Sequence, residues 1–260
     1  MSRIKQVFQN TDVHKALVAY ITAGDPNLET TLELMHSLAA NGADIIELGV
    51  PFSDPMSDGP TIQRAAERAL ANGVSLTDVL ETVRRFRQSN QSTPVVLMGY
   101  LNPIHKMGYE PFARAAQEAG VDGVLTVDSP IETVAPLHNA LKAAGLDTIF
   151  LVAPTTGEAR MDEIAKLASG FVYYVSLKGV TGSASLNTAE VAEKVAVLRR
   201  HVPLPICVGF GISDAESARQ IAAVADGVVI GSRIVKEIEA NPGREAEAAG
   251  KLVKSLKEAI

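Results

Sequence analysis

The chain has 260 residues, of which 47% are hydrophobic and 21% charged, a composition typical of a soluble protein with a large core and long enough for one or two domains. A net charge of −6 excludes the basic surface that nucleic acid or an anionic membrane requires, and the single cysteine, Cys207, excludes an internal disulfide. The sequence has no apolar run of about 18 residues, and its start, MSRIKQVFQN, lacks the apolar segment of a signal peptide, so we expect a cytoplasmic protein.

Eight short apolar runs, rich in β-branched residues, recur along the chain, and most of them end in Gly, Asp or Ser. They are continuously apolar rather than alternating, which is typical of strands buried on both faces of a parallel sheet. In chain order, the predicted strands are residues 16–22, 43–50, 94–100, 121–127, 148–153, 171–177, 205–210 and 227–231.

Segments with the apolar spacing of helices separate these runs and also close the chain. The predicted helices are residues 29–40, 75–89, 111–119, 131–144, 159–168, 188–200, 214–222 and 244–259. Eight strands that alternate with helices predict an α/β fold, a single-domain (β/α)8 TIM barrel over residues 1–260 with a short N-terminal helix and extra terminal helices. A doubly wound open sheet is the alternative, which the absence of a GxGxxG motif after the first predicted strand disfavours.

Polar residues follow most of the predicted strands directly, at the carboxyl end where barrels of this kind hold their active sites. The candidates in chain order are Thr22, Asp25, Glu47, Asp54, Asp58, Tyr100, Asn102, Asp128, Lys178, Thr181 and Ser232. Their grouping at one end of the barrel supports both the strand predictions and this location for the site.

Glu47 lies inside the second predicted strand, between Ile46 and Leu48, where a carboxylate is costly unless it is paired or neutral. Asp58 follows on a loop stiffened by prolines. Because the two carboxyl groups have such different settings, we expect their pKa values to differ, as one site needs to hold both an acid and a base. The alternative is that Glu47 pairs with a core Lys or Arg and that the aspartates cap turns.

Glycine-rich segments follow the last three predicted strands: GVTG at 179–182, GFGIS at 209–213 and GSR at 231–233. Glycines let a backbone approach a ligand closely, and the N–H groups at the start of a helix attract an anion. We therefore predict a phosphate site that includes Gly182, Gly211, Gly231 and Ser232; glycines that merely end strands are the alternative.

Lys178 follows the sixth predicted strand, where a solvated loop lysine is the favoured interpretation and the Schiff-base lysine of an aldolase is the alternative. The five histidines are scattered, and no pair of them has metal-ligand spacing on adjacent strand ends. The sequence therefore indicates no metal site.

Several segments, in the same order, resemble the α subunit of tryptophan synthase between residues 16 and 239. They are ALVAYITAGDP, ADIIELGVPFSDPMSDGPTIQ, MGYLNPI, YYVSLKGVTG, VGFGIS and GVVIGSRIVK. The stretch from Glu47 to Gln63 is highly specific to that family, whereas the glycines of the phosphate loops are not. The resemblance implies a TIM-barrel lyase of L-tryptophan biosynthesis that cleaves indole-3-glycerol phosphate, by a retro-aldol reaction, to indole and glyceraldehyde 3-phosphate.

By this resemblance, Glu47 protonates C3 of the indole and later takes the proton from the glycerol hydroxyl. Asp58 accepts the indole N–H and stabilises the positive charge on the ring nitrogen. Thr181 is implied to lie on a loop that closes over the substrate, where it is able to hydrogen-bond Asp58. The residues implied to bind the substrate are Tyr20, Ile62, Met98, Tyr100, Leu125, Tyr173 and Thr181. For each pocket-lining residue, simple packing in the core or at its rim is the alternative.

The resemblance also implies a partner, the β subunit, which carries pyridoxal phosphate and receives the indole through a tunnel. This chain would then hold no cofactor of its own and would assemble as an α2β2 heterotetramer, with segments 51–60 and 102–108 facing the partner. The sequence departs from the family at Met56-Ser57, where a larger aliphatic residue and then alanine are usual, and in the variable stretches 128–130 and 177–178. These departures bear on the coupling to the partner more than on the chemistry.

Two other functions stay open on the residues alone. One is another phosphate-binding barrel enzyme, either a Schiff-base aldolase that uses Lys178 or a sugar-phosphate isomerase or epimerase. The other is a non-catalytic regulatory subunit that docks through the proline-rich loop. Intact Glu47 and Asp58 argue against this loss of catalysis.

Overall fold

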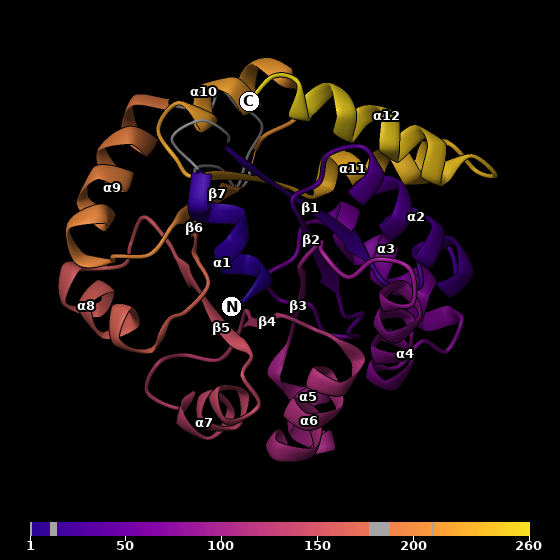
Figure 1. The fold of residues 1–260 in the computed structure, drawn as a ribbon, viewed down its shortest axis with the longest axis horizontal. Coiled ribbons are helices and arrows are strands. Elements are labelled where there is room, and N and C mark those ends of the chain that lie inside the picture. Colours follow the sequence, from indigo (N-terminus) through magenta and orange to yellow (C-terminus); the bar gives the residue numbers. More distant parts are fainter. Residues whose placement is uncertain (1, 11–14, 177–187, 210) are drawn as a thin grey trace.

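The computed structural model describes residues 2–10, 15–176, 188–209 and 211–260, in which eight parallel strands close in chain order into a barrel ringed by helices (Figure 1). The strands are β1 (Ala16–Thr22), β2 (Ile45–Gly49), β3 (Val95–Gly99), β4 (Gly123–Thr126), β5 (Asp147–Val152), β6 (Val172–Val175), β7 (Ile206–Gly209) and β8 (Gly227–Ile230). Because β1 pairs with both β2 and β8, the sheet has no free edge. The predicted α/β TIM barrel is confirmed.

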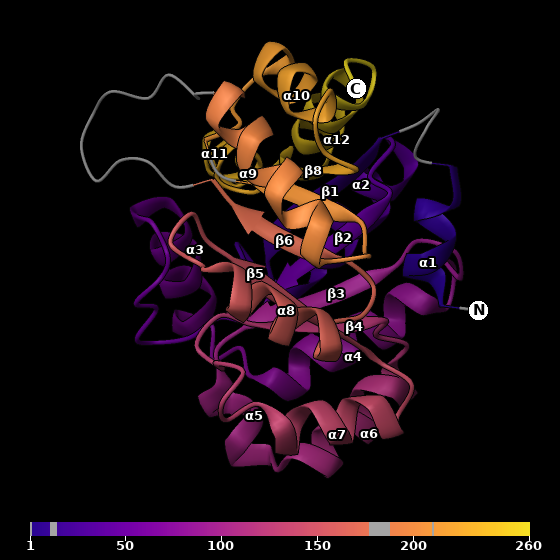
Figure 2. The same cartoon turned by 90° about the vertical axis from the view of Figure 1, so that its left-hand side faces the viewer.

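The outer ring has at least one helix after each strand, and a second helix after β2, β3 and β8. These helices are α2 (Leu28–Ala40), α3 (Pro60–Ala71), α4 (Leu76–Arg87), α5 (Leu101–Met107), α6 (Tyr109–Ala119), α7 (Ala135–Ala143), α8 (Glu158–Leu167), α9 (Thr188–His201), α10 (Ala215–Ala222), α11 (Ser232–Ala240) and α12 (Glu245–Lys257). The short α1 (Arg3–Val7) and the 3₁₀ helix η1 (Phe8–Asn10) precede β1, and the side view places α1 at one end of the barrel (Figure 2). In the described part of the chain, no helix is both long and apolar enough to cross a membrane.

Three helices, α3, α5 and α11, are absent from the predicted helices, and α7 begins later than predicted; proline explains the differences at α3 and α7. α3 is absent from the predicted helices because its start continues the proline-rich loop, yet Pro60 occupies its first turn, where no intrahelical N–H hydrogen bond is lost. The predicted helix 131–144 begins only at Ala135, since Pro136 fits the first turn of a helix and not its interior.

The hydrophobic core has one layer between the sheet and the helices and a second layer inside the barrel. The barrel interior is filled by Val18, Ile45, Val96, Leu125, Ile149, Phe171, Tyr173, Cys207 and Val229, together with Ile4 of α1. Side chains of alternate strand residues share a face, so Glu47 and Gly49 face the same interior as Ile45. A carboxyl group therefore stands in the packed centre of the barrel.

Carboxylates at the N-terminal ends of the strands are held in structural contacts. Asp122, which precedes β4, accepts the backbone N–H of Val95 at 2.8 Å and forms a salt bridge with Arg87 at 2.7 Å. Asp226, which precedes β8, accepts the backbone N–H of Ile206 at 2.8 Å. Since these groups support the fold, the reactive groups are to be sought at the opposite end of the barrel.

Candidate active site

Glu47 lies at the centre of β2, a strand in which every residue is buried. Its exposed fraction is 1%, and within the described residues its Oε1 has no hydrogen-bond partner. Burial raises the pKa of Glu47 to about 8, so the carboxyl group is largely protonated at neutral pH. The alternative in which Glu47 pairs with a core Lys or Arg finds no support in the described part of the chain.

Asp58 lies on the loop between β2 and α3 and is fixed there by Tyr100. The Tyr100 hydroxyl donates to Asp58 Oδ2 at 3.1 Å and accepts the backbone N–H of Ser57 at 3.0 Å. The Tyr100 ring stacks on Phe52, with the ring centroids 5.1 Å apart. Burial raises the pKa of the Asp58 carboxyl, and the hydrogen bond from Tyr100 opposes that rise. The predicted substrate residue Tyr100 therefore directly contacts the second carboxyl group.

Tyr20 and Tyr173 occupy equivalent positions on two different strands of the barrel wall. Tyr20 of β1 is in register with Glu47, and its phenol leans over Gly49, where a Cβ atom would lie 2.2 Å from the hydroxyl oxygen. Tyr173 of β6 leans in the same way over Gly209 of β7, again with 2.2 Å between the hydroxyl and the position of a Cβ. Both tyrosine rings thus use the space that a side chain on the next strand would fill.

The apolar candidates gather into two clusters that share Met98. Tyr20 and Ile62 belong to one cluster, together with Ala65 and Val235. Leu125 and Tyr173 belong to the packed barrel interior. Because Met98 packs against both clusters, the structure brings five of the predicted substrate residues into one continuous apolar region. Tyr100, by contrast, lies in neither cluster.

Two of the predicted phosphate residues, Gly231 and Ser232, form the start of α11. Gly231 precedes this helix and Ser232 is its first residue. A Cβ atom on Gly231 would lie 3.3 Å from Cβ of Tyr20, so the start of α11 adjoins the wall that carries Glu47. Gly211, with φ of 77°, lies shortly after β7. The free N–H groups of the first turn of α11 therefore face the same end of the barrel as Asp58.

Some sequence predictions fall on residues that the structure does not describe. Thr181, Gly182 and Lys178 lie within 177–187, outside the described ranges, so their placement is untested. Among the residues that are described, no group of three or more His, Cys, Asp or Glu side chains is placed to hold a metal ion.

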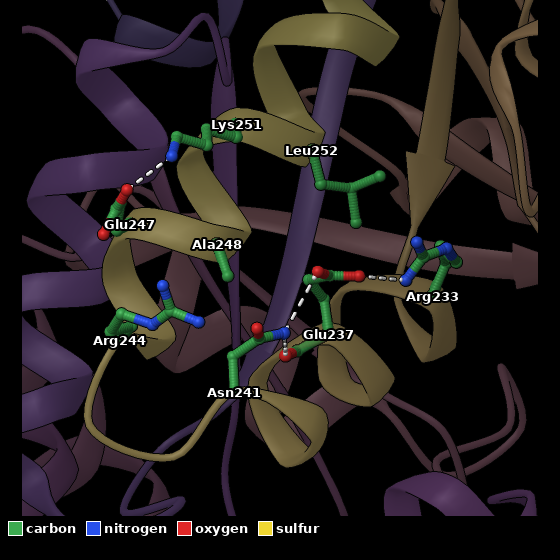
Figure 3. Close-up of a pocket in the computed structure, with 8 residues that line it drawn as sticks. All are labelled: Arg233, Glu237, Asn241, Arg244, Glu247, Ala248, Lys251 and Leu252. Atoms are coloured by element: carbon green, nitrogen blue, oxygen red, sulfur yellow. Dashed lines mark hydrogen bonds and ion pairs between the residues drawn. The ribbon is translucent and has the colours of Figure 1, made fainter.

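A polar pocket of about 390 Å³ lies on the outside of the barrel, between α11 and α12 (Figure 3). Arg233 and Glu237 form a salt bridge of 2.6 Å on its wall, and Lys251 pairs with Glu247 one helical turn away. These charges are already neutralised by their neighbours, and none of the predicted site residues lines this pocket. We therefore place the candidate site at the barrel mouth, beside Glu47.

Sequence reasoning missed Phe52 and Gly49 and assigned Gly209 only to a phosphate loop, although all three shape this region. The signal for the glycines is in the strand register, because each lies two residues beyond the residue that pairs with a tyrosine. The strand boundaries alone do not reveal this register. Phe52 lies next to the prolines of the loop, and nothing in its local sequence indicates that it stacks on Tyr100.

Comparison with known proteins gives one consistent result. A family model described as tryptophan synthase alpha chain matches residues 8–260. The tryptophan synthase alpha chain of Neisseria meningitidis serogroup B is 67% identical, with both chains fully covered. The crystal structure of tryptophan synthase subunit alpha from Legionella pneumophila superposes with a TM-score of 0.93 at 44% identity, covering 100% of this chain and 98% of that one. A chain of the tryptophan synthase complex from Pyrococcus furiosus has a TM-score of 0.84 at 37% identity, covering 94% of this chain and 99% of that one.

Proposed function

Since the chain belongs to the tryptophan synthase alpha chain family, a lyase family that cleaves indole-3-glycerol phosphate in tryptophan biosynthesis, we propose that Glu47 and Asp58 carry out this cleavage. The products are indole and glyceraldehyde 3-phosphate, and the indole passes to a β subunit. The observation that carries the proposal is the buried Glu47 carboxyl, whose Oε1 has no partner among the described residues and whose pKa is raised to about 8. Such a group is protonated before reaction and able to return to that state afterwards.

Glu47 acts as acid and then as base. Its protonated carboxyl delivers a proton to C3 of the indole, which makes the ring an acceptor for the electrons of the breaking carbon–carbon bond. The carboxylate that results takes the proton of the glycerol hydroxyl as this oxygen becomes the aldehyde of glyceraldehyde 3-phosphate. The bond electrons restore the aromatic indole, and Glu47 ends in its starting state.

Asp58 stabilises the intermediate charge. Protonation at C3 places positive charge on the indole nitrogen, and the Asp58 carboxylate, held by the hydroxyl of Tyr100, accepts the N–H of that ring. A pre-oriented anion at this position costs little reorganisation when the charge develops. Tyr100 therefore orients Asp58.

The remaining predicted residues bind the two ends of the substrate. Tyr20, Ile62, Met98, Leu125 and Tyr173 form the apolar surface for the flat indole. The N–H groups at Gly231 and Ser232 bind the phosphate through the positive end of the α11 dipole, and Gly211, which follows β7, is proposed to contribute to the same site. Thr181 and Gly182 are proposed to close over the bound substrate.

The partner is proposed to be a tryptophan synthase β subunit in a cytoplasmic α2β2 heterotetramer, with pyridoxal phosphate in that subunit and no cofactor in this chain. The docking surface is proposed to include segments 51–60 and 102–108. In the first of these, Met56 is 81% exposed and borders a pocket of about 320 Å³ lined in part by Phe52 and Leu70. An exposed apolar side chain beside a hollow suits a protein partner.

Indole release from indole-3-glycerol phosphate, measured with and without the β subunit, tests this proposal. We expect slow release from the isolated chain and a sharp rise when the partner is added. Absence of release in both conditions would discard the proposed catalytic roles. Borohydride trapping of the substrate on Lys178 would then test the Schiff-base alternative.

A further inference from the structure

A network of four charged side chains joins α3 to α11 and to the loop between β1 and α2. Arg68 of α3 donates from Nε to Asp25 Oδ1 at 2.7 Å and from Nη2 to Asp25 Oδ2 at 2.9 Å. Its Nη1 donates to Glu239 of α11 at 2.9 Å. Arg64, one turn earlier in α3, donates to both carboxylate oxygens of Glu239 at 3.1 and 3.0 Å. We call Asp25, Arg64, Arg68 and Glu239 the α3–α11 brace.

Asp25 anchors the brace in the interior. It is 2% exposed, and both of its carboxylate oxygens are bound by the single guanidinium of Arg68. A buried carboxylate is tolerated only when it is paired and hydrogen-bonded, and the planar fork of arginine meets both oxygens at once. The ammonium group of lysine is a point charge and has no such fork. The orientation of Arg68 is therefore set by a buried carboxylate on the loop between β1 and α2.

The same two helices also pack directly against the wall of the active site. Ile62 and Ala65 of α3 form one apolar cluster with Val235 of α11 and Tyr20 of β1. In sequence, Arg64 adjoins Ala65, and Glu239 follows Val235 by one helical turn. The position of α3 against α11 thus decides where Ile62 and the Tyr20 ring lie.

Each helix also begins at one end of the proposed substrate site. α3 begins at Pro60, directly after the loop that carries Asp58, and α11 begins at Ser232. On the proposed function, Asp58 holds the indole nitrogen and Ser232 the phosphate. A single substrate molecule therefore spans from the start of one helix to the start of the other, and its length fixes the spacing that the helices must keep.

We propose that Arg68 is a positioning residue for this reaction, which through the α3–α11 brace sets the spacing between the indole end and the phosphate end of the site. This inference rests on the proposed roles of Asp58 and of the α11 amides. A misplacement of about 1 Å between reacting groups is enough to slow catalysis about 100-fold. A brace that controls the spacing acts on the rate for a substrate that bridges both ends. It has little effect on a small ligand that occupies only one end.

The test uses Arg68→Lys, which keeps the charge and removes the fork, assayed in the complex with saturating β subunit. We expect kcat/KM for indole-3-glycerol phosphate to fall about tenfold or more. The inhibition constants of inorganic phosphate and of indole, each measured separately, should stay within about twofold of wild type, because each ligand fills one end only. Glu239→Gln, which leaves Asp25 paired with Arg68, should give the same pattern and decides the question if Arg68→Lys fails to fold.

The matched control is Arg85→Lys. Arg85 of α4 makes a forked pair with the exposed Glu29 of α2, at 2.6 and 2.7 Å, on the outside of the barrel. Its substitution should leave kcat/KM within about twofold.

The proposal is overturned if Arg68→Lys or Glu239→Gln keeps wild-type kcat/KM, or if phosphate or indole affinity falls as much as kcat/KM. Asp58→Asn is assayed in parallel: wild-type turnover there would overturn the proposed function, and with it the brace, whereas an inactive Asp58→Asn beside active brace variants overturns the brace alone.

Discussion

The hydroxyl of Tyr100 donates a hydrogen bond to Oδ2 of Asp58 at 3.1 Å. The same hydroxyl accepts the backbone N–H of Ser57, and the ring stacks on Phe52, so Tyr100 makes three different contacts to the loop that carries Asp58. The loop follows β2 and is closed by Gly59 and Pro60 at the start of α3. One aromatic residue at the end of β3 therefore holds the carboxylate that we propose for the indole nitrogen.

Tyr100→Phe keeps the stacked ring and removes the hydroxyl. The hydrogen bond from Tyr100 lowers the pKa of Asp58, so its loss allows burial to raise that pKa further. Since Asp58 must be ionised to stabilise the indolium charge, activity at the acid side should be lost at a higher pH than in wild type. We expect kcat near neutral pH to fall about tenfold, measured together with the pH dependence of kcat.

The control for this substitution is Tyr174→Phe. Tyr174 of β6 is buried on the helix-facing side of the sheet, so removal of its hydroxyl tests the general effect of losing a buried phenol. The acid side of its kcat–pH profile should coincide with that of wild type. If the acid side of the kcat–pH profile of Tyr100→Phe is not shifted, this would contradict the role assigned to the hydrogen bond from Tyr100 to Asp58.

Glu47→Gln preserves the shape of the side chain but cannot deliver or take up a proton at C3. We expect kcat to fall about 100-fold or more at every pH, while KM changes little, because the substitution removes a step in chemistry rather than a binding contact. In the wild-type protein, activity should decline as pH rises through about 8, where Glu47 loses its proton. Near-normal turnover of the variant would remove Glu47 from the mechanism.

Although Glu47→Gln should lower activity, it should raise the stability of the fold at pH 8. The pKa of Glu47 is about 8 in the folded chain against an ordinary value of 4.5, so between these values the unfolded chain ionises and the folded chain does not. The stability contributed by the neutral form is complete below pH 4.5 and is lost progressively as pH rises to about 8. Glu47→Gln should therefore be more stable than wild type at pH 8, by a few kcal/mol relative to the difference at low pH.

Urea unfolding of both proteins at several pH values checks this expectation. Glu118→Gln, on the exposed face of α6, controls for the loss of a carboxylate as such. A difference in unfolding free energy between Glu47→Gln and wild type that does not change with pH would show that the buried carboxyl is already ionised in the folded chain.

Much of this architecture follows from local sequence patterns. The continuously apolar runs predicted all eight strands, because strands buried on both faces leave little room for polar residues. Glu47 was recognisable as the exception within such a run. The predictions around Pro60 and Pro136 were wrong: α3 was not predicted, and the start of α7 was predicted too early. Proline occurs both in loops and in the first turn of a helix, so it does not show which of the two is present.

Contacts between distant segments were beyond the reach of these patterns. The hydrogen bond from Tyr100 to Asp58 and the pair of Arg68 with Asp25 each join residues more than 40 positions apart. Nothing local to either residue indicates its partner. The space left by Gly49 for the Tyr20 ring depends in addition on the register of β1 against β2, which the strand boundaries do not fix.

Gly49→Ala tests whether that space shapes the site. The added Cβ would lie 2.2 Å from the hydroxyl oxygen of Tyr20 and 2.6 and 2.8 Å from two of its ring carbons, so the whole ring must move away from β2. Displacement of the ring into the proposed indole pocket should lower kcat/KM about 10- to 100-fold. Gly157→Ala is the control, because a Cβ at Gly157 meets no atom within 4 Å.

A second substitution separates this steric effect from a general loss of stability. Tyr20→Phe in the Gly49→Ala background should not restore activity, since the ring carbons remain too close to the new Cβ. Tyr20→Leu in the same background removes the conflicting atoms and should recover part of kcat/KM. If Tyr20→Leu lowers activity equally with glycine or alanine at position 49, the two residues act independently and Gly49 does not set the position of the Tyr20 ring.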